Sequence, residues 1–336
     1  MATPYESEWL TRKKRVDPQL EAAGWTVVPF DEHRLLASYA QHAIAEHPTS
    51  NGPADYALAG GGLAIGVVEA KKLSIGPQGA LTQAERYSRG FPPGPFDFGG
   101  LRVPFLYSTN GEVIHFHDVR DPLNRSRRVA RYHTPSALED LLDRDYAAAC
   151  AWFSANPNAH PRLRPYQIEA NNAVEDALAK RKRTMLLAMA TGTGKTVTLV
   201  SQVYRLLKSG AARRVLFLVD RRALAAQAVR QFAAFEPEPN QKFDAIYEVY
   251  SQRFQREDLG DDGKFDPKVL PNEYLTNPQP KHVFVYVCTI QRMAINLFGR
   301  GAVWSGEGDD LDEDARQIDI PVHAFDVVIA DECHRG

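Results

Sequence analysis

The sequence is poor in cysteine and has no long hydrophobic run. Its three cysteines, Cys150, Cys288 and Cys333, form no CxxC pair, which argues against a disulfide-bonded scaffold and against a structural zinc site. The longest apolar stretches, residues 215–219 and 283–290, are far shorter than the about 20 residues that cross a bilayer. Charged residues near the N-terminus stand where a signal peptide has its apolar core. The sequence therefore predicts a cytoplasmic protein without membrane segments.

An excess of charge is lacking too, which excludes a generally polycationic nucleic-acid binder. Lys and Arg number 40 and Asp and Glu number 42, for a net charge of −2, so any nucleic-acid site has to be a local patch. Hydrophobic residues make up 44% and charged residues 24% of the chain, close to the average of soluble globular proteins, which excludes disordered, collagen-like and coiled-coil chains.

The chain of 336 residues is long enough for two domains of about 150 residues each. A stretch rich in Ala, Asn and Pro interrupts the regular patterns near the middle of the sequence, as linkers do. We predict an N-terminal domain over residues 1–146, a linker over residues 147–161 and a second domain over residues 162–336.

The first domain is predicted to mix helices with a β-sheet. The patterns indicate a helix over residues 6–23, a strand over 25–30, a hairpin over 54–71 with glycines at its turn, a helix around residues 81–87 and a second hairpin turning at Asn110-Gly111. That dipeptide favours a type I′ turn. The result is an α/β domain around a mixed sheet.

Acidic and basic side chains gather at the ends of the first predicted hairpin. Glu69 and Lys71 share one face of a strand because side chains alternate with period two, and Asp55 lies at the start of the neighbouring strand. Carboxylates bind Mg²⁺, and a lysine can stabilise or deprotonate the water that attacks a phosphodiester. By itself the pattern Asp…Glu-x-Lys is equally compatible with an ordinary solvated strand face.

The second domain alternates short apolar strands with helices, which predicts a parallel sheet buried on both faces. We expect strands at residues 185–189, 215–219, 283–288 and 327–330. Residues 236–280 and 301–320 are polar, Pro-rich or acidic and are predicted to be surface insertions.

A glycine-rich turn between an apolar strand and a helix predicts a phosphate-binding loop. Backbone N–H groups of such a turn converge on phosphate oxygens, the lysine reaches the β- and γ-phosphates and the hydroxyl binds Mg²⁺. Met189 replaces the first glycine of the general pattern. The loop contains Thr191, Gly192, Thr193, Gly194, Lys195 and Thr196.

An acidic pair follows the last predicted strand. Asp331 would orient the metal and Glu332 would polarise the attacking water. A solvent-facing strand end is the alternative, but the position at the end of a neighbouring strand favours the nucleotide site.

The motifs of the second domain resemble those of superfamily 2 helicases and translocases. Residues 189–196 resemble motif I, residues 331–334 (Asp-Glu-Cys-His) motif II, and Arg164-Pro-Tyr-Gln167 the upstream glutamine motif; residues 218–221 and 289–291 resemble two DNA-contacting motifs. The resemblance implies that Lys195, Thr196, Asp331 and Glu332 serve ATP and Mg²⁺ and that Gln167 binds the base. The stretches around Arg221 and Thr289 would contact one DNA strand.

The first domain resembles PD-(D/E)xK nucleases, with Ala54 in place of the proline. Together with Gln83-x-x-x-Tyr87 and Glu8, it resembles the N-terminal part of the R (restriction/translocase) subunit of type I restriction-modification enzymes. The resemblance implies Asp55 and Glu69 as metal ligands, Lys71 as the catalytic lysine, Glu8 as an auxiliary acid, and Gln83 and Tyr87 as a supporting pair.

This resemblance also implies a fold and partners. A restriction-endonuclease-like domain would precede an incomplete RecA-like P-loop domain, truncated after motif II. Such an enzyme cuts double-stranded DNA with Mg²⁺ and ATP, together with separate methylation (M) and specificity (S) subunits. Because hydrolysis in this superfamily needs a second RecA-like domain, we expect these residues alone to bind nucleotide weakly and not to translocate DNA.

Two other functions fit the same residues. One is a stand-alone nuclease-helicase in DNA repair or phage defence, and the other is a DNA-binding docking module with a dead nuclease site. The arginines between Arg120 and Arg131 could grip phosphates or form a plain solvated loop.

Overall fold

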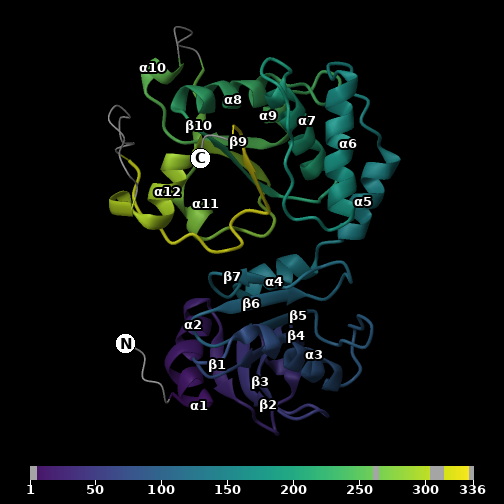
Figure 1. Ribbon diagram of the computed structural model, residues 1–336, viewed down its shortest axis with the longest axis vertical. Helices are drawn as coiled ribbons and strands as arrows, with labels where there is room; N and C mark the ends of the chain where they lie inside the picture. The colour runs from purple at the N-terminus through teal and green to yellow at the C-terminus, as the bar shows by residue number, and fades with distance from the viewer. Residues whose placement is uncertain (1–5, 260–264, 303–313, 333–336) are drawn as a thin grey trace. The chain divides into compact units, whose positions relative to one another are not determined.

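The computed structural model describes residues 6–259, 265–302 and 314–332 (Figure 1). The chain divides into two compact units, Met1–Asp143 and Arg144–Gly336. The first contains a seven-stranded mixed sheet and the second a five-stranded parallel sheet, which confirms the predicted α/β class. Within the described residues no helix has the length and apolar character needed to cross a bilayer.

The first unit begins with a helical segment that contains one wide turn. Ser7 caps its start by accepting a hydrogen bond from the Leu10 N–H (3.2 Å), and Gly24 ends it with a φ of +87°, which glycine adopts without strain. The wide π turn between the two α-helical parts holds one extra residue. These parts are α1 (Glu8–Thr11), η1 (Arg12–Val16) and α2 (Asp17–Ala22).

The sheet of the first unit runs in chain order from β1 to β7. The β1–β2 and β4–β5 pairs are parallel and the other four pairs are antiparallel. Its strands are β1 (Thr26–Pro29), β2 (His42–His47), β3 (Ala54–Gly60), β4 (Leu63–Ala70), β5 (Phe105–Thr109), β6 (Ile114–Asp118) and β7 (Arg127–Val129). Its remaining helices are η2 (Leu36–Ser38), η3 (Pro77–Ala80), α3 (Leu81–Gly90) and α4 (Pro135–Leu142).

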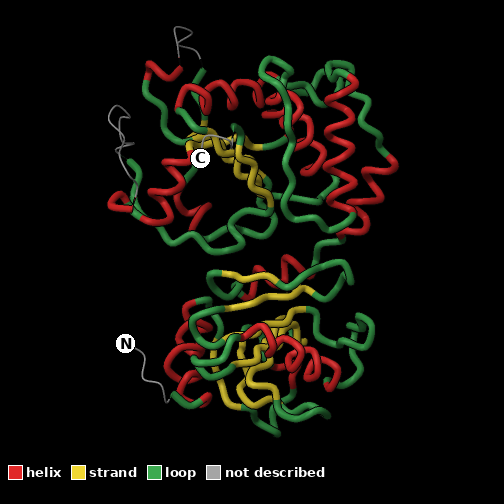
Figure 2. Tube along the Cα trace, viewed as in Figure 1, coloured by secondary structure: helices red, strands yellow, loops and turns green. Residues whose placement is uncertain are grey.

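Both faces of this sheet are buried, as the period-two alternation requires. Tyr56 and Leu58 point to the face that packs with Leu20 of α2, whereas Ala57 points to the opposite face, which packs with Ala84 of α3. The middle strands β3, β4 and β5 are therefore held between helices (Figure 2), which makes them a rigid base for side chains at their ends.

The predicted type I′ turn at Asn110-Gly111 is wrong. The Asn110 N–H donates to the Val113 carbonyl at 3.4 Å, so this bond encloses Gly111 and Glu112 and the turn lies one residue later than predicted. Only Gly111 takes a positive φ there (+86°). The Asn110 side chain explains the difference, because its Oδ1 accepts hydrogen bonds from the N–H groups of Glu112 and Val113 and closes the turn.

The second unit holds a parallel sheet in the order β10-β9-β11-β8-β12. Helices cover both faces: Val229 of α8 packs with Phe217 on one face, and Met293 of α12 packs with Tyr286 on the other. Its strands are β8 (Arg214–Val219), β9 (Glu248–Ser251), β10 (Lys268–Val269), β11 (Phe284–Thr289) and β12 (Val327–Ala330). Its helices are α5 (Tyr146–Ala155), α6 (Pro165–Ala179), α7 (Lys195–Lys208), α8 (Arg222–Ala234), α9 (Phe243–Ile246), α10 (Arg256–Leu259), α11 (Asn272–Thr276), α12 (Ile290–Phe298) and η4 (Arg300–Ala302).

Two sequence predictions about this unit need correction. The predicted linker, residues 147–161, contains most of helix α5, whose Phe153 is buried in the core against α7. The Ala-rich half of the stretch thus forms a helix, and only the Asn/Pro-rich half is irregular. Likewise, the predicted insertion over residues 236–280 supplies β9 and β10, because short strands with polar neighbours carry little periodic signal.

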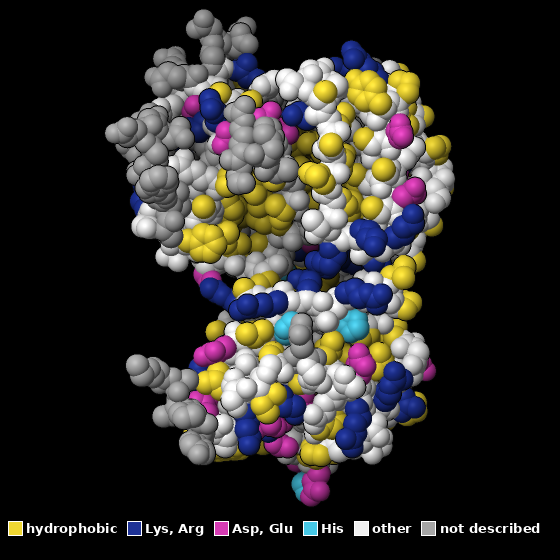
Figure 3. All heavy atoms as spheres, viewed as in Figure 1, with side chains coloured by type: hydrophobic (Ala, Val, Ile, Leu, Met, Phe, Trp, Pro, Cys, Tyr) yellow, Lys and Arg dark blue, Asp and Glu magenta, His cyan; other side chains and the backbone are white. Residues whose placement is uncertain are grey.

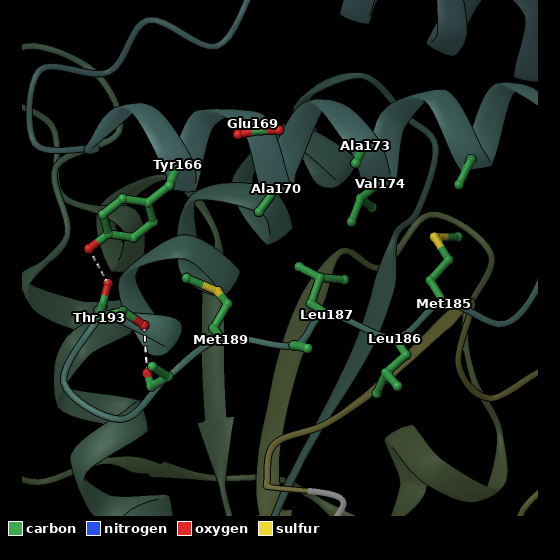
Figure 4. Close-up of a pocket in the computed structure, with 13 residues that line it drawn as sticks. Tyr166, Glu169, Ala170, Ala173, Val174, Met185, Leu186, Leu187, Met189 and Thr193 are labelled. Carbon is green, nitrogen blue, oxygen red and sulfur yellow. Dashed lines mark hydrogen bonds between the residues drawn. The ribbon is translucent and has the colours of Figure 1, made fainter.

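The strand predicted at residues 185–189 is extended but joins no ladder among the described residues. Exposure alternates along it as in a strand: Met185, Leu187 and Met189 are half-buried beside a hollow of about 610 Å³ against α6 (Figure 4), while Leu186, which also lines the hollow, is 80% exposed. The apolar pattern predicted a strand buried on both faces, but one side is only half-buried and the other is exposed, since a pattern does not specify a hydrogen-bonding partner.

Candidate functional site

Three carboxylates from three elements converge in the first unit. Tyr56 pairs with Val68 across β3 and β4, so Asp55 lies opposite Glu69, and α1 brings Glu8 to the same place. Ligand oxygens of Glu8, Asp55 and Glu69 all lie within 4.8 Å of one another. The structure thus unites residues that are far apart in the sequence.

Lys71 lies beside these carboxylates. Its Nζ donates to Glu69 Oε1 at 2.5 Å and is 4.0 Å from Glu8 Oε1. The backbone N–H of Lys71 donates to the Thr109 carbonyl at 2.7 Å, which continues the β4–β5 ladder past the end of β4. This pairing fixes Lys71 and Glu69 on one face of the sheet.

The residues fit a divalent metal ion. Glu69 is 2% exposed, and among the described residues its buried Oε2 has no hydrogen-bond partner. An unpaired buried carboxylate oxygen is costly unless a cation or a proton satisfies it. Mg²⁺ prefers hard oxygen ligands from one or two carboxylates plus water and phosphate, and Glu69 with Asp55 and Glu8 can supply them.

Burial and mutual repulsion raise the proton affinity of the cluster. Desolvation, then the charge of Asp55, raises the pKa of Glu69 to about 8, against the lowering effect of Lys71. Burial also raises the pKa of Asp55, although the Ala70 N–H and Arg12 oppose it. Burial alone would lower the pKa of Lys71, but its contacts with Glu69 raise it, so the ammonium form is favoured.

The raised pKa of Glu69 predicts a pH-dependent metal affinity. Protons and Mg²⁺ compete for this carboxylate, so the affinity should rise by roughly tenfold per pH unit from about pH 6 and level off near pH 8. Titration calorimetry of the nucleotide-free protein at several pH values measures this slope. In Glu69→Gln the slope should be much smaller, and an equal slope in both proteins would contradict the assignment.

Arg12 is a member of this cluster that the sequence patterns did not reveal. Its Nη1 donates to Asp55 Oδ1 at 3.0 Å and to the carboxylate of Glu46, and its guanidinium lies over the Tyr56 ring at 5.0 Å. Asp55 Oδ2 accepts from the Ala70 N–H at 2.7 Å. A signal existed, because Arg12 follows Glu8 by four residues and so shares a helix face with it.

Gln83 and Tyr87 bond to each other on α3. Gln83 Nε2 donates to the Tyr87 hydroxyl at 2.9 Å, as expected for residues four apart on a helix. This bond does not tie the pair to the carboxylates, so their supporting role stays a prediction.

The basic stretch after β6 divides into structural and exposed arginines. Arg120 forms a two-pronged pair with Asp118 and donates to the Leu141 carbonyl, so it fixes the loop against α4. Arg125 and Arg128 are exposed. Figure 3 shows Lys and Arg side chains on this part of the first unit, over β6 and β7.

The glycine-rich loop of the second unit precedes α7 directly. Gly192 and Gly194 take positive φ values of +78° and +80°, which open the backbone for the turn. Lys195 begins α7, with Thr196 next to it in the first turn. Lys195 Nζ is 3.5 Å from Glu332 Oε1, so the loop and the end of β12 meet.

Asp331 and Glu332 follow β12, as their motif requires. The Asp331 N–H donates to the Leu218 carbonyl at 2.8 Å, and Asp331 Oδ1 accepts from the Glu332 N–H at 3.0 Å. The remaining residues of the motif, Cys333 and His334, lie outside the described residues.

Gln167 contacts the glycine-rich loop itself. Its Oε1 accepts from the Arg164 N–H at 2.8 Å, and its Nε2 donates to the carbonyls of Thr193 and Gly194, both at 3.1 Å. The Tyr166 hydroxyl also donates to the Thr193 carbonyl, at 2.9 Å (Figure 4). The Gln167 side chain would have to give up these hydrogen bonds in order to bind an adenine base.

The two expected DNA-contacting stretches differ in exposure. Arg221 is exposed beside Asp220, whereas Thr289 is buried, caps α12 and bonds to Gln252. The Thr289 side chain is therefore structural, and any DNA contact of this stretch falls to its neighbours.

Comparisons with known proteins match both units. A family model described as "Type III restriction enzyme, res subunit" matches residues 160–336, more than half of the chain, and one described as "Type I restriction enzyme EcoKI endonuclease subunit second domain" matches residues 36–142. The type I restriction enzyme EcoKI endonuclease subunit of Escherichia coli strain K12 is 30% identical over 96% of this chain and 28% of its own length. The EcoAI endonuclease subunit of Escherichia coli is 29% identical over 58% of this chain and 25% of its own length.

The chain therefore spans little more than a quarter of these relatives. Among solved structures, a fragment assigned as an HsdR subunit of a type I restriction enzyme from Vibrio vulnificus YJ016 is 19% identical, over 99% of this chain and 52% of that chain. Its TM-score of 0.31 is too low to establish a shared arrangement.

Proposed function

Because this chain belongs to the family of type I restriction enzyme endonuclease subunits, we propose that its first unit is a Mg²⁺-dependent DNA endonuclease. The observation that carries the proposal is the convergence of Glu8, Asp55 and Glu69 beside Lys71. Hard oxygen ligands next to an ammonium group suit the hydrolysis of a phosphodiester.

In the proposed reaction Asp55 and Glu69 hold the ion and Glu8 completes the acidic set. A bound Mg²⁺ supplies Lewis acidity toward a phosphate oxygen and lowers the pKa of water. Lys71 is ammonium because its pKa is raised, so it stabilises negative charge on the phosphate as the bond breaks rather than removing a proton.

For the second unit we propose ATP and Mg²⁺ binding, with coupling to movement along double-stranded DNA. Lys195 in the first turn of α7 would contact the phosphates, Thr196 and Asp331 would hold Mg²⁺, and Glu332 would polarise water. The loop conformation at Gly192 and Gly194 and the proximity of Lys195 to Glu332 support this proposal.

The partners proposed are duplex DNA and separate methylation and specificity subunits, with the assembly working in the cytoplasm. The names of the relatives support this, since they are endonuclease subunits of type I restriction enzymes. Movement along DNA is proposed for the complete enzyme; this chain spans 28% of the length of the EcoKI endonuclease subunit.

Plasmid cleavage by the assembled enzyme tests both sites. Asp55→Asn should lower the rate of Mg²⁺-dependent cleavage by more than roughly 100-fold, because loss of a residue that only contacts a metal ligand already costs up to that factor. ATP binding should remain. Lys195→Ala should lose ATP binding and leave Mg²⁺ binding at the carboxylates unchanged. Asp31→Asn, on the exposed end of the β1 region, is the matched control and should cut normally.

Cutting by Asp55→Asn at the rate of the unsubstituted enzyme would refute the nuclease proposal. It would leave the docking-module alternative, in which the carboxylates have no part in cleavage.

A further inference from the structure

We propose that the guanidinium of Arg12 occupies the place of a second cation in the carboxylate cluster, so that the cluster binds a single divalent ion. The inference rests on the proposed nuclease function and adds the metal stoichiometry of that site. Hydrolases of phosphate esters use either one or two metal ions, and two-metal sites need carboxylates that bridge ions about 3.5–4 Å apart.

Arg12 bridges two carboxylates in the way that a second ion would. Its Nη1 donates to Asp55 Oδ1 at 3.0 Å and also to the Glu46 carboxylate, and its Nη2 lies 3.4 Å from the Asp55 carbonyl. A cation next to Asp55 on this side would have to displace the guanidinium, because both would use the same oxygens.

The guanidinium is held too firmly to move aside. Arg12 is 6% exposed and lies over the Tyr56 ring, with its Nε 3.5 Å from the Tyr56 hydroxyl. That hydroxyl in turn donates to Asp17 of α2. If the guanidinium moved aside, it would lose its contact with the aromatic ring and its hydrogen bonds to the carboxylates.

Glu46 pairs with Arg12 and does not contribute to the proposed Mg²⁺ position. It lies between the pairs Ala45–Tyr56 and His47–Ala54 of β2 and β3, hence opposite Asp55, and its φ is +55°. Its side chain is 57% exposed and contacts Arg12, and it is not among the three carboxylates that converge at the proposed metal position. Glu46 therefore pairs with Arg12 on the side away from Glu69.

The charges of the cluster agree with a single ion. When all are ionised, the carboxylates of Glu8, Glu46, Asp55 and Glu69 face two side-chain cations, Arg12 and Lys71, so one divalent ion neutralises the remainder. Without Arg12, Asp55 and Glu46 would present two unneutralised carboxylates to a further ion.

Counting bound Mn²⁺ by electron paramagnetic resonance, with Mg²⁺ calorimetry alongside, tests the inference. The chain is used without nucleotide and in an Asp331→Asn background, so that the P-loop site does not contribute. We expect one ion for Arg12 and two for Arg12→Met, which keeps the apolar stem but removes the charge. A second ion in the Arg12 protein, or only one in a folded Arg12→Met, would overturn the inference.

Two further variants keep the result interpretable. Glu46→Gln with Arg12 present should keep one ion of unchanged affinity, whereas the double variant Arg12→Met/Glu46→Gln should fall back to one ion. Two ions in the double variant would overturn the assignment of Glu46. Circular dichroism checks that each variant is folded. Binding of no ion by the Arg12 protein would instead refute the proposed nuclease site itself, which separates the two failures.

Discussion

Replacing Lys71 with methionine is expected to slow Mg²⁺-dependent cleavage by about 10²–10³-fold, the usual cost of removing one group that stabilises developing negative charge. Lys71 Nζ is 2.5 Å from Glu69 and near Glu8, so its loss removes the positive charge next to the proposed phosphate position. Rates of plasmid nicking under saturating Mg²⁺ measure the effect.

Lys72 offers a matched control for this change. It is the next residue in the chain, but it is exposed, whereas the Lys71 side chain is only 17% exposed. Lys72→Met removes the same charge from the protein and should leave the cleavage rate unchanged. Equal losses in the two variants would mean that net charge, and not the position of Lys71, governs cutting.

The second large effect is expected on stability, at Asp326. Its Oδ1 is 2.8 Å from Arg144 Nη1 and 3.6 Å from Arg214 Nη2, and its Oδ2 accepts from the N–H groups of Arg213 and Arg214. Removing one partner of a buried ion pair typically costs about 3–5 kcal/mol. Asp326→Ala should lower the free energy of unfolding of the second unit by that amount in urea denaturation.

The pH dependence of this contribution has a definite sign. Burial alone would raise the pKa of Asp326, but Arg144 and Arg214, with two backbone N–H groups, lower it below its usual value. A carboxylate with a depressed pKa stabilises the folded protein at pH values above the pKa that it has in the unfolded chain, about 3.9 for aspartate. This stabilisation is lost as the pH falls below that value. The difference between Asp326 and Asp326→Ala should therefore be constant near neutrality and shrink in acid.

Asp266→Asn is the control for the loss of an acidic group from the same unit, because Asp266 is exposed. It should change the unfolding free energy by less than about 0.5 kcal/mol. A comparable loss in Asp266→Asn would indicate a general charge effect in place of the Asp326 network.

Local patterns predicted the parts of the site that depend on chain neighbours. Glu69 and Lys71 share a face because a strand alternates, and Lys195 begins a helix after a glycine turn; both follow from a few adjacent residues. The position of Asp55 opposite Glu69 needed one further step, the pairing of two strands joined by a short glycine turn. The two sheets of the α/β fold follow from the same short-range signals.

Long-range contacts were beyond these patterns. Arg12 meets Glu46 and Asp55 across more than thirty residues of sequence. Its spacing of four residues from Glu8 places the two on one helix face, but it does not predict that Arg12 is buried, since Lys13 and Lys14 beside it are exposed. That the extended segment at residues 185–189 joins no ladder among the described residues likewise could not be predicted from its own residues. Periodicity states which side chains turn inward, but it does not state what they meet there.

The wide turn η1 makes the proposed active site depend on the length of the chain as well as on its residues. Val16 and Leu20 anchor the C-terminal part of this helical segment in the core, while Glu8 and Arg12 at the other end face the carboxylates. Each residue of an α-helix turns the next by about 100°, so deleting one residue from the turn, such as Lys14, would rotate Glu8 away from Asp55 although every side chain of the proposed site is still in the chain. Such a deletion would change the direction in which these site residues point, and not their identity.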